Sequence, residues 1–416
     1  MTATSTRSSS TTGGARARQR EQRAWQTRSW SPASKPGARS RASTAWGWTR
    51  PAPCRSSSIR TTWRRWLDCG ERSIQGRSPT PAKSSPPRGC AEKRLAPTAA
   101  TPWRRSDLPS VFEVRSVREA AEILRRAAAE RLTVSIDRPG GDLVVSTRGL
   151  DQVLEHEAGD LTCTVEAGIR LSSLNGRLAG HGQMLALDPP GDPTIGACIA
   201  ANLSGPRRHR YGTMRDLLLG VTVVLGDGLV ASAGGKVVKN VAGYDLGKLL
   251  VGSQGRLGLV ARASLRLHPL PGATATLVVP VDSPEEAHHK AQAILRSTLV
   301  PSALDILWPG RLAVMFEGSP KAVAAQIDRA AELVGGEEAG DAVWEEARAR
   351  QARAPGCLSF SPGGLAQVLG SWEEAVVRVS AGLAYVPEPV PEEVGEPLRS
   401  LVERLRAAFD PAGVLV

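Results

Sequence analysis

The stretch that decides the fold is residues 188–271, which read DPPGDPTIGACIAANLSGPRRHRYGTMRDLLLGVTVVLGDGLVASAGGKVVKNVAGYDLGKLLVGSQGRLGLVARASLRLHPLP. Small residues crowd its first part, namely Gly191, Thr194, Gly196, Ala197, Ala200, Ala201, Ser204 and Gly205. A backbone without large side chains can lie flat against a planar or phosphorylated ligand, and its N–H groups stay free to donate. A second glycine-rich turn follows at Gly252, Gly255 and Gly258. Two such surfaces on either side of a predicted hairpin favour a site for a large nucleotide cofactor.

The charge of the chain is unevenly distributed. The 416 residues contain 53 Lys and Arg against 41 Asp and Glu, a net charge of +12 that by itself would suggest a polyanionic partner. However, 22 of the basic and 5 of the acidic residues lie in residues 1–107, so that segment carries +17 and the remaining 309 residues carry −5. The remainder of the chain therefore gives no support for binding nucleic acid.

Residues 1–107 have a composition unlike that of a folded domain. They are rich in Arg, Ser, Thr, Ala, Pro and Gly, yet they hold seven of the ten tryptophans, whereas disordered tails are usually poor in aromatics. GC-rich DNA read in the wrong frame gives text of this kind, so we interpret the segment as a disordered, low-complexity region that arises from a misassigned start or a frameshift. A targeting segment and a nucleic-acid-binding arm are the alternatives. The segment contains no apolar core of a secretory signal, and its tryptophans follow no spacing.

The rest of the composition limits the class of protein. The six cysteines form no CxxC pair, so neither a zinc ribbon nor an iron–sulfur cluster is predicted, and we expect small buried side chains in a reducing compartment. The histidines show no metal-ligand spacing, so no metal site is predicted and surface or core positions are expected for them. No apolar run reaches the ~18 residues of a membrane span. Residues 108–416 are long enough for two domains of ordinary size.

The pattern of residues 108–271 predicts both helices and strands. Ser116 and Glu119 form a capping box that opens a helix with one apolar face. Strands are predicted at 132–136, 143–146 and 161–166, and a short helix at 172–181. Residues 218–225 and 229–233 are predicted to form a hairpin about Gly226-Asp227-Gly228, and residues 257–267 a closing strand.

After Gly272 the pattern changes to that of a smaller α/β domain. Strands at 274–281, 304–308 and 312–316, with helices beginning after Ser283 and Ser319, predict a split βαβ sheet with helices on one face. Residues 335–390 are expected to be rich in loops, and a terminal helix is predicted near 397–408. We therefore predict an α+β protein with domains at 108–271 and 272–416, the C-terminal helix being part of the second.

Two segments, PTIGACIAANLSGPRRHRYGTMRDLLLGV and VGSQGRLGLVARASLRLHPLP, resemble the FAD-binding domain of the PCMH-type flavoproteins, the vanillyl-alcohol-oxidase superfamily. Within it, GGKVVKNVAGYDLGKLL and the terminal FDPAGVL resemble the FAD-binding E-type subunit of bacterial glycolate oxidase. The resemblance extends over residues 111–271 and more loosely beyond. It implies a two-subdomain FAD-binding domain followed by a smaller α/β cap domain at the edge of the isoalloxazine ring.

The resemblance also implies which residues bind FAD. Those expected to run along the flavin and the diphosphate are Pro190, Gly191, Thr194, Gly196, Ala197, Ala200, Ala201, Ser204 and Gly205. Gly212 and Asp216 are expected to shape the turn into the next strand. The residues expected to meet the adenosine half or the flavin ring are Gly255, Gly258, Leu259 and Val260.

The sharpest charge cluster in residues 108–416 is Arg207-Arg208-His209-Arg210. A guanidinium fork suits phosphate oxygens, so one of these arginines, Arg207, is expected against the diphosphate, and at least two of the other residues are expected in a solvated loop. Lys236 and Lys239 are candidates to neutralise reduced flavin or to bind a substrate carboxylate. A surface interaction loop is the equal alternative for them.

The loop after the predicted strand 132–136 departs from the family. It reads SIDRPGGD at 135–142, in place of the longer GGGT-like diphosphate loop. Asp137 and Asp142 would add negative charge where an anion site needs converging N–H donors. A histidine for covalent flavin attachment would lie in this same loop, so non-covalent FAD is expected.

Two functions follow from the resemblance. The first is a subunit of an FAD-dependent oxidoreductase acting on CH–OH groups, which oxidises a small 2-hydroxy acid such as glycolate and works beside a second flavoprotein subunit and an iron–sulfur subunit. A cytoplasmic location is expected, peripheral to a membrane through that complex. The second is a non-catalytic structural subunit with weak or no flavin binding, which the shortened loop favours. The sequence identifies no catalytic base.

Overall fold

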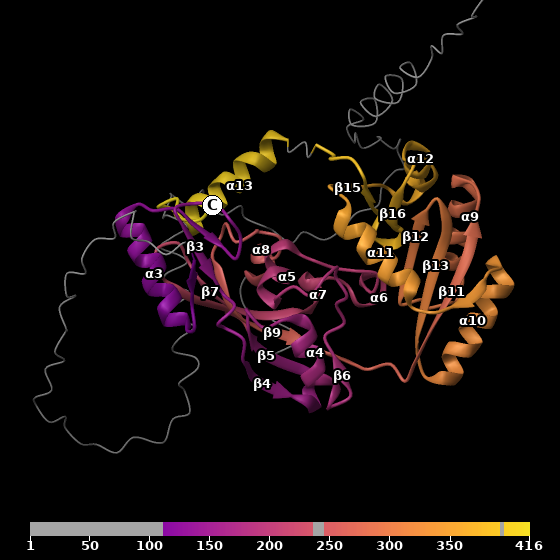
Figure 1. Ribbon diagram of the computed structural model, residues 1–416, viewed down its shortest axis with the longest axis horizontal. Coiled ribbons are helices and arrows are strands. Elements are labelled where there is room, and N and C mark those ends of the chain that lie inside the picture. Colours follow the sequence, from indigo (N-terminus) through magenta and orange to yellow (C-terminus); the bar gives the residue numbers. More distant parts are fainter. Residues whose placement is uncertain (1–110, 236–244, 392–394) are drawn as a thin grey trace, which may run out of the picture. The chain divides into compact units, whose positions relative to one another are not determined.

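The protein is described here by a computed structural model, which covers residues 111–235, 245–391 and 395–416 (Figure 1). Its buried apolar side chains gather in four clusters. Two of them draw on residues 114–267 together with the C-terminal residues 409–415, and the other two draw on residues 277–386. The prediction of an α+β architecture is confirmed.

The first small sheet is parallel and is covered by one helix. Helix α3 (Val117–Glu130) begins at Ser116, whose hydroxyl accepts a hydrogen bond from the Glu119 N–H, while the Glu119 carboxylate accepts from the N–H of Arg115. The strands β1 (Phe112–Glu113), β3 (Leu143–Ser146) and β2 (Val134–Ile136) lie in that order. The predicted capping box and apolar helix face are confirmed, because the side chains that α3 buries recur at helical spacing.

A five-stranded antiparallel sheet forms the second part of this half. Its order is β4 (Val153–Glu157), β5 (Thr162–Glu166), β9 (Leu259–Arg266), β7 (Leu218–Val224) and β8 (Val230–Gly234). The predicted hairpin is confirmed, with Val224 paired to Val230. The helices of this half are α4 (Leu171–Ala179), α5 (Ile195–Ala201), α6 (Arg208–Tyr211), α7 (Met214–Leu217) and α8 (Gly247–Leu250). A two-stranded pair, β6 (Gln183–Met184) with β10 (His268–Pro269), completes it.

Residues 273–386 build a seven-stranded antiparallel sheet. Its order is β14 (Glu337–Ala339), β11 (Ala273–Val281), β13 (Gly310–Gly318), β12 (Ala303–Trp308), β16 (Ala375–Arg378), β17 (Leu383–Val386) and β15 (Gly356–Ser359). Helices α9 (Pro284–Arg296), α10 (Pro320–Val334) and α12 (Leu365–Ser371) pack on one face. The predicted strands and helices between 274 and 334 are confirmed.

One expectation for this half was wrong. Residues 335–390 are not mainly loop, since they contain two helices and contribute four strands to the same sheet. The two predicted helices, α9 and α10, lie on one face as expected, whereas α11 (Ala342–Arg353), which was not predicted, covers the other face with Val343, Trp344 and Ala347. Trp344 can be buried there because its indole N–H donates to the Thr276 hydroxyl at 2.9 Å. The strands are short, so their alternation was too brief to be recognised in the sequence.

The C-terminal helix packs on the first half of the chain, which corrects its predicted place in the second domain. Phe409 of α13 (Glu396–Phe409) joins the core of the five-stranded sheet, and Val414 and Leu415 join the cluster under α3. Leu415 forms a parallel bridge with Val134, which extends the small sheet beyond β2. Figure 1 shows the C-terminus close to β3, where Val414 and Leu415 join the core under α3.

Replacing Phe409 by Ala tests this packing. Its side chain is 6% exposed, so we expect the Phe409→Ala variant to lower the free energy of unfolding by about 3 kcal/mol. Leu398 on the same helix is 54% exposed, and Leu398→Ala should change it by less than about 0.5 kcal/mol. Urea unfolding of both variants measures the difference, and equal effects would contradict this placement of α13.

Candidate functional site

Helix α5 carries the small-residue segment and lies very close to the chain beneath it. The Thr194 hydroxyl caps its first turn by accepting from the Ala197 N–H, and Asn202 ends it with φ +48°. A Cβ on Gly196 would lie 3.1 Å from the carbonyl oxygen of Ala167, so glycine permits this close approach.

The second glycine segment docks on the end of α5. The N–H of Gly252 donates to the carbonyl of Ile199 at 2.9 Å, and the N–H of Gln254 donates to the carbonyl of Ala200 at 2.7 Å. Gly255, at φ +78°, places its α-carbon beside Ile136 at the end of β2. The structure therefore brings together three segments that lie far apart in the sequence: the end of β2, the end of α5 and the turn at 252–255.

Several of the predicted cofactor-binding residues have packing roles. Leu259 and Val260 bury their side chains in the cores, and a Cβ on Gly258 would lie 2.4 Å from the Val223 side chain. A Cβ on Gly205 would lie 1.8 Å from the carbonyl oxygen of Asp188. Residues 258–260 are buried, backbone included, so the structure gives them a packing role and no surface open to a ligand.

The remaining predicted residues fall into two groups. Gly212 and Asp216 shape a turn, in which the Asp216 carboxylate accepts from the N–H of Thr213 at 2.8 Å and closes a capping box at the start of α7. Gly191 has φ +70° and nothing within 4 Å of the position a Cβ would take, so its outer side is open. The other partly or fully exposed members of the set are Pro190, Thr194, Gly196, Ala197, Ala200, Ala201 and Gly255, whereas Ser204 is buried.

The carboxylates of the short loop after β2 are held by hydrogen bonds from neighbouring threonines. Asp137 accepts from both the N–H and the hydroxyl of Thr147, and Asp142 accepts from both the N–H and the hydroxyl of Thr133 at 2.9 Å. Ser135 donates to the carbonyl of Gly140 across the loop. These hydrogen bonds fix the orientation of both carboxylates. The negative charges that were expected to weaken an anion site here therefore each have hydrogen-bond donors in the protein.

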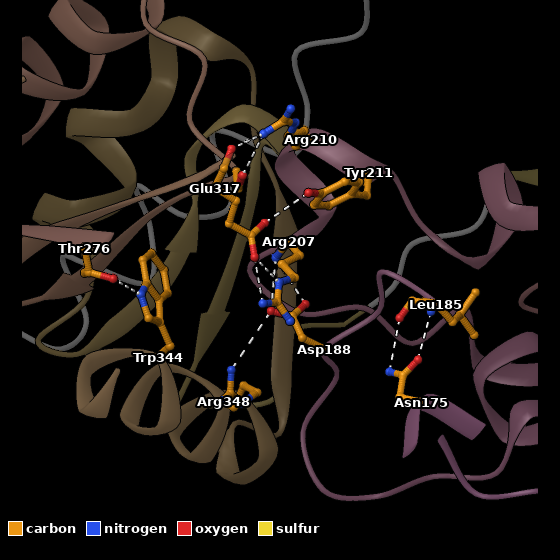
Figure 2. Close-up of polar contacts among 11 residues, drawn as sticks. Asn175, Leu185, Asp188, Arg207, Arg210, Tyr211, Thr276, Glu317, Trp344 and Arg348 are labelled. Atoms are coloured by element: carbon orange, nitrogen blue, oxygen red, sulfur yellow. Dashed lines mark hydrogen bonds and ion pairs between the residues drawn. The ribbon is translucent and has the colours of Figure 1, made fainter. Parts of the chain in front are cut away.

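The basic segment 207–211 is bound to the seven-stranded sheet. The Arg207 guanidinium donates to the Glu317 carboxylate at 2.7 and 3.0 Å, and the Tyr211 hydroxyl donates to the same carboxylate at 3.1 Å. Arg210 donates to the Glu317 carbonyl at 2.8 Å, as Figure 2 shows. Arg207 is therefore engaged by a carboxylate and not free for a diphosphate. Residues 208–211 form helix α6 in place of a loop; Arg210 is exposed, and the partly exposed His209 lies 2.6 Å from the Ser380 hydroxyl.

Asp188 is the most perturbed carboxylate at this junction. Its side chain is 8% exposed, it accepts from the N–H of Arg207 at 3.1 Å, and Arg348 of α11 lies 4.0 Å away. Burial raises the pKa of Asp188 to about 6, and the nearby arginines oppose that rise. Figure 2 shows Asp188 between Arg207 and Arg348.

A second group of charged side chains, centred on Arg378, lies near Asp188. Arg378 is fully buried and forms an ion pair with Asp305, while its other terminal nitrogen donates to the Gln351 side chain. Its guanidinium carbon lies 5.8 Å from the centre of the Tyr385 ring. Burial lowers the pKa of Arg378 to about 10.

The sequence did not point to Glu317, Arg348, Arg378 or Tyr385. The available signal for Glu317 was a lone acidic residue directly after the apolar run LAVMF. Arg348, Arg378 and Tyr385 lie in the segment expected to be loop, where no pattern predicts the partners of these side chains.

The other candidate side chains are accounted for as follows. Lys236 and Lys239 lie outside the described residues. Cys163 and Cys198 are buried, as expected, and burial raises the pKa of both thiols to about 12, whereas Cys357 is exposed. In the part of the chain that the structure describes, no three His, Cys, Asp or Glu side chains are placed to hold a metal ion, and no helix is long and apolar enough to span a bilayer.

Comparison with known proteins identifies the class. A family profile described as "FAD binding domain" matches residues 109–234. The computed structure is similar to that of alkyldihydroxyacetonephosphate synthase, with a TM-score of 0.58 and 15% identity over 73% of this chain and 76% of that one, which shows a shared fold. Residues 109–234 therefore belong to an FAD-binding domain, and FAD is the cofactor of that domain.

Several curated proteins are similar in sequence to this chain. The chain is 32% identical to the glycolate oxidase subunit GlcE of Escherichia coli over 219 residues, which are 52% of this chain and 61% of that subunit. It is 36% identical to the mitochondrial D-lactate dehydrogenase [cytochrome] 1 of Saccharomyces cerevisiae over 158 residues, 38% of this chain and 27% of that enzyme. The chain thus spans about six tenths or less of the length of these relatives.

The described residues fit an FAD. The open side of Gly191, the small residues of α5 and the adjoining turn at 252–255 leave backbone accessible along one surface. The side-chain oxygen of Asn202, at the end of α5, is buried and has no hydrogen-bond partner among the described residues. A buried acceptor without a partner costs about 1–3 kcal/mol, which a donor on a bound cofactor would offset.

Stability should depend on the ionisation of Asp188. Its pKa is near 4 in the unfolded chain and about 6 in the folded protein, so the folded state holds the proton more tightly. The contribution of Asp188 to the free energy of unfolding should therefore fall as pH rises from about 4 to about 6, by about 1–3 kcal/mol. Unfolding curves of the protein and of Asp188→Asn across this window measure the change, and a constant difference between them would contradict it.

Gly205 should tolerate no side chain. A Cβ there would meet the Asp188 carbonyl oxygen at 1.8 Å, so we expect Gly205→Ala to lower the free energy of unfolding by at least about 2 kcal/mol. Gly176→Ala is the matched control, since Gly176 is exposed in α4 with nothing near its Cβ position, and alanine should stabilise that helix by up to about 1 kcal/mol. Thermal unfolding distinguishes the two, and a stable Gly205→Ala protein would refute the close contact.

Proposed function

We propose that this chain is the FAD-binding subunit of an oxidoreductase that oxidises a small 2-hydroxy acid to the 2-oxo acid and passes the electrons to a second flavoprotein subunit and an iron–sulfur subunit. The observation that carries the proposal is the meeting of α5 with the 252–255 turn beside the arginine-rich segment 207–211. A carboxylate substrate suits such positive surroundings. The names of the relatives, a glycolate oxidase subunit and a D-lactate dehydrogenase, support the same substrate class.

The bound flavin supplies the two-electron acceptor. We assign its contacts to the accessible backbone and small side chains of Pro190, Gly191, Thr194, Gly196, Ala197, Ala200, Ala201 and Gly255. The packing that supports this surface comes from Ser204, Gly205, Gly212 and Asp216. The loop 137–142 contains no histidine, so the FAD is held without a covalent bond. The buried thiols Cys163 and Cys198 suit a reducing compartment such as the cytoplasm.

The second candidate is a structural subunit of the same complex. The observation that favours it is the loop after β2. The carboxylates of Asp137 and Asp142 and the hydroxyl of Ser135 all form hydrogen bonds within the protein, so they are not free to bind a cofactor. On this view the fold is kept for assembly and FAD is bound weakly.

Flavin retention separates the two candidates. The full chain, mixed with FAD and desalted, should keep absorption bands near ~450 nm, and a 2-hydroxy acid such as D-lactate or glycolate should bleach them without oxygen. Ala201 is exposed at the end of α5, so Ala201→Leu should obstruct the cofactor surface and reduce retained FAD at least about tenfold. Ala325→Leu, on an exposed face of α10, is the control and should retain FAD.

A folded but colourless protein would support the structural subunit. Retained FAD that no 2-hydroxy acid bleaches would contradict the proposed substrate class. Equal retention by the Ala201→Leu variant and its control would remove α5 from the cofactor site.

A further inference from the structure

The charges at the junction between segment 204–211 and the seven-stranded sheet do not balance. Glu317 is paired with Arg207, Asp305 with Arg378, and Asp188 with Arg348. Arg208 and Arg210 are left over, since neither forms an ion pair with a carboxylate of the described residues, and Arg210 donates instead to the Ser302 hydroxyl and the Glu317 carbonyl. This junction thus holds two guanidinium groups more than its carboxylates neutralise, and Arg208 is the one of the two that is partly buried, where charge is costly.

The Arg208 guanidinium has only uncharged partners. One of its nitrogens donates to the Ser204 hydroxyl at 3.0 Å, and the group also interacts with the hydroxyl of Tyr385 on β17. Arg378 lies near the same tyrosine, and its buried Nε has no hydrogen-bond partner among the described residues. Two guanidinium groups and a phenol hydroxyl therefore converge, with donor capacity unused.

The guanidinium groups of Arg208 and Arg378 repel each other. Burial lowers the pKa of Arg378 and Arg208 lowers it further, whereas Tyr385 and Asp188 act in the opposite direction. An anion placed against Arg208 would relieve that repulsion. A carboxylate is suited to it, because its two oxygens match the planar fork of a guanidinium.

The position of Arg208 relates it to the cofactor surface. Ser204 lies in the turn that follows α5, whose small residues form that surface, and Arg208, the first residue of α6, donates to the Ser204 hydroxyl. On the other side, Tyr385 lines a cavity of about 280 Å³ that opens between the end of α11 and the strands β16 and β17, with Arg350, Arg353 and Glu374 on its walls. A small acid bound at Arg208 would lie beside Tyr385, one of the residues that line this cavity.

We propose that Arg208 binds the carboxylate of the 2-hydroxy acid and that Tyr385 and Arg378 position it. This inference rests on the proposed function, and it adds which side chains select an acid over a neutral alcohol. Arg378 acts through its neighbours, because its terminal nitrogens are already held by Asp305 and Gln351.

Binding of oxalate to the FAD-loaded full chain tests this assignment, because oxalate is a small dicarboxylate that cannot be oxidised by hydride loss. Arg208→Gln should weaken oxalate binding roughly 30-fold or more in calorimetry and raise KM for D-lactate similarly, since it removes one partner of a charged contact. Arg208→Lys keeps the positive charge but lacks the planar guanidinium, so its affinity for oxalate should lie between those of the unaltered protein and of Arg208→Gln. Arg329→Gln, which removes an exposed charge on α10, should bind oxalate like the unaltered protein.

The outcomes separate this inference from the function on which it rests. Retained FAD and the thermal midpoint are measured for every variant, and Arg208→Lys serves where Arg208→Gln does not fold. Unchanged oxalate binding in a folded Arg208 variant overturns the carboxylate site, whether or not the protein oxidises D-lactate. Oxalate binding that depends on Arg208, in a protein whose flavin no 2-hydroxy acid bleaches, supports the site and refutes the proposed oxidation.

Discussion

The buried carboxylate of Glu317 constrains the rest of this structure. Its side chain is fully buried at the end of β13, where an unpaired negative charge would cost several kcal/mol. Arg207 and Tyr211 satisfy it from the other half of the chain, and Arg210 binds the carbonyl of the same residue. Because removal of one partner of such a pair costs about 3–5 kcal/mol, segment 207–211 is tied to the seven-stranded sheet. This contact between segment 207–211 and the sheet brings the charged side chains of Asp188, Arg208 and Arg378 close to one another.

The small residues of segment 188–258 meet two demands at once. Some permit close packing inside the protein, as Gly205 does against the Asp188 backbone and Gly258 against Val223. Others, such as Gly191, leave backbone open on the outside. The same residue types therefore serve packing and ligand approach, and their spacing in sequence does not tell which role each one has.

The chain leaves the first half at residue 271 and returns to it with α13. Phe409, Val414 and Leu415 complete the cores of the two sheets of that half, and Leu415 pairs with Val134 next to the loop after β2. The second sheet is thus inserted between two parts of the chain that pack together. This arrangement places the seven-stranded sheet beside segment 204–211 while both connections run to the same half.

The sequence by itself determined the class of fold, the cofactor and most local elements of residues 111–334. Capping at Ser116, the hairpin about Gly226-Asp227-Gly228 and the order of the two glycine segments are local signals that neighbouring residues specify. The tertiary structure decided the place of α13, the strands between 335 and 390 and the partner of Arg207. These depend on pairings across more than a hundred residues, such as Arg207 with Glu317, and no local periodicity encodes them. A buried charge finds its partner only when the fold brings the two segments together, so the junction that we assign to substrate binding had to be seen in three dimensions.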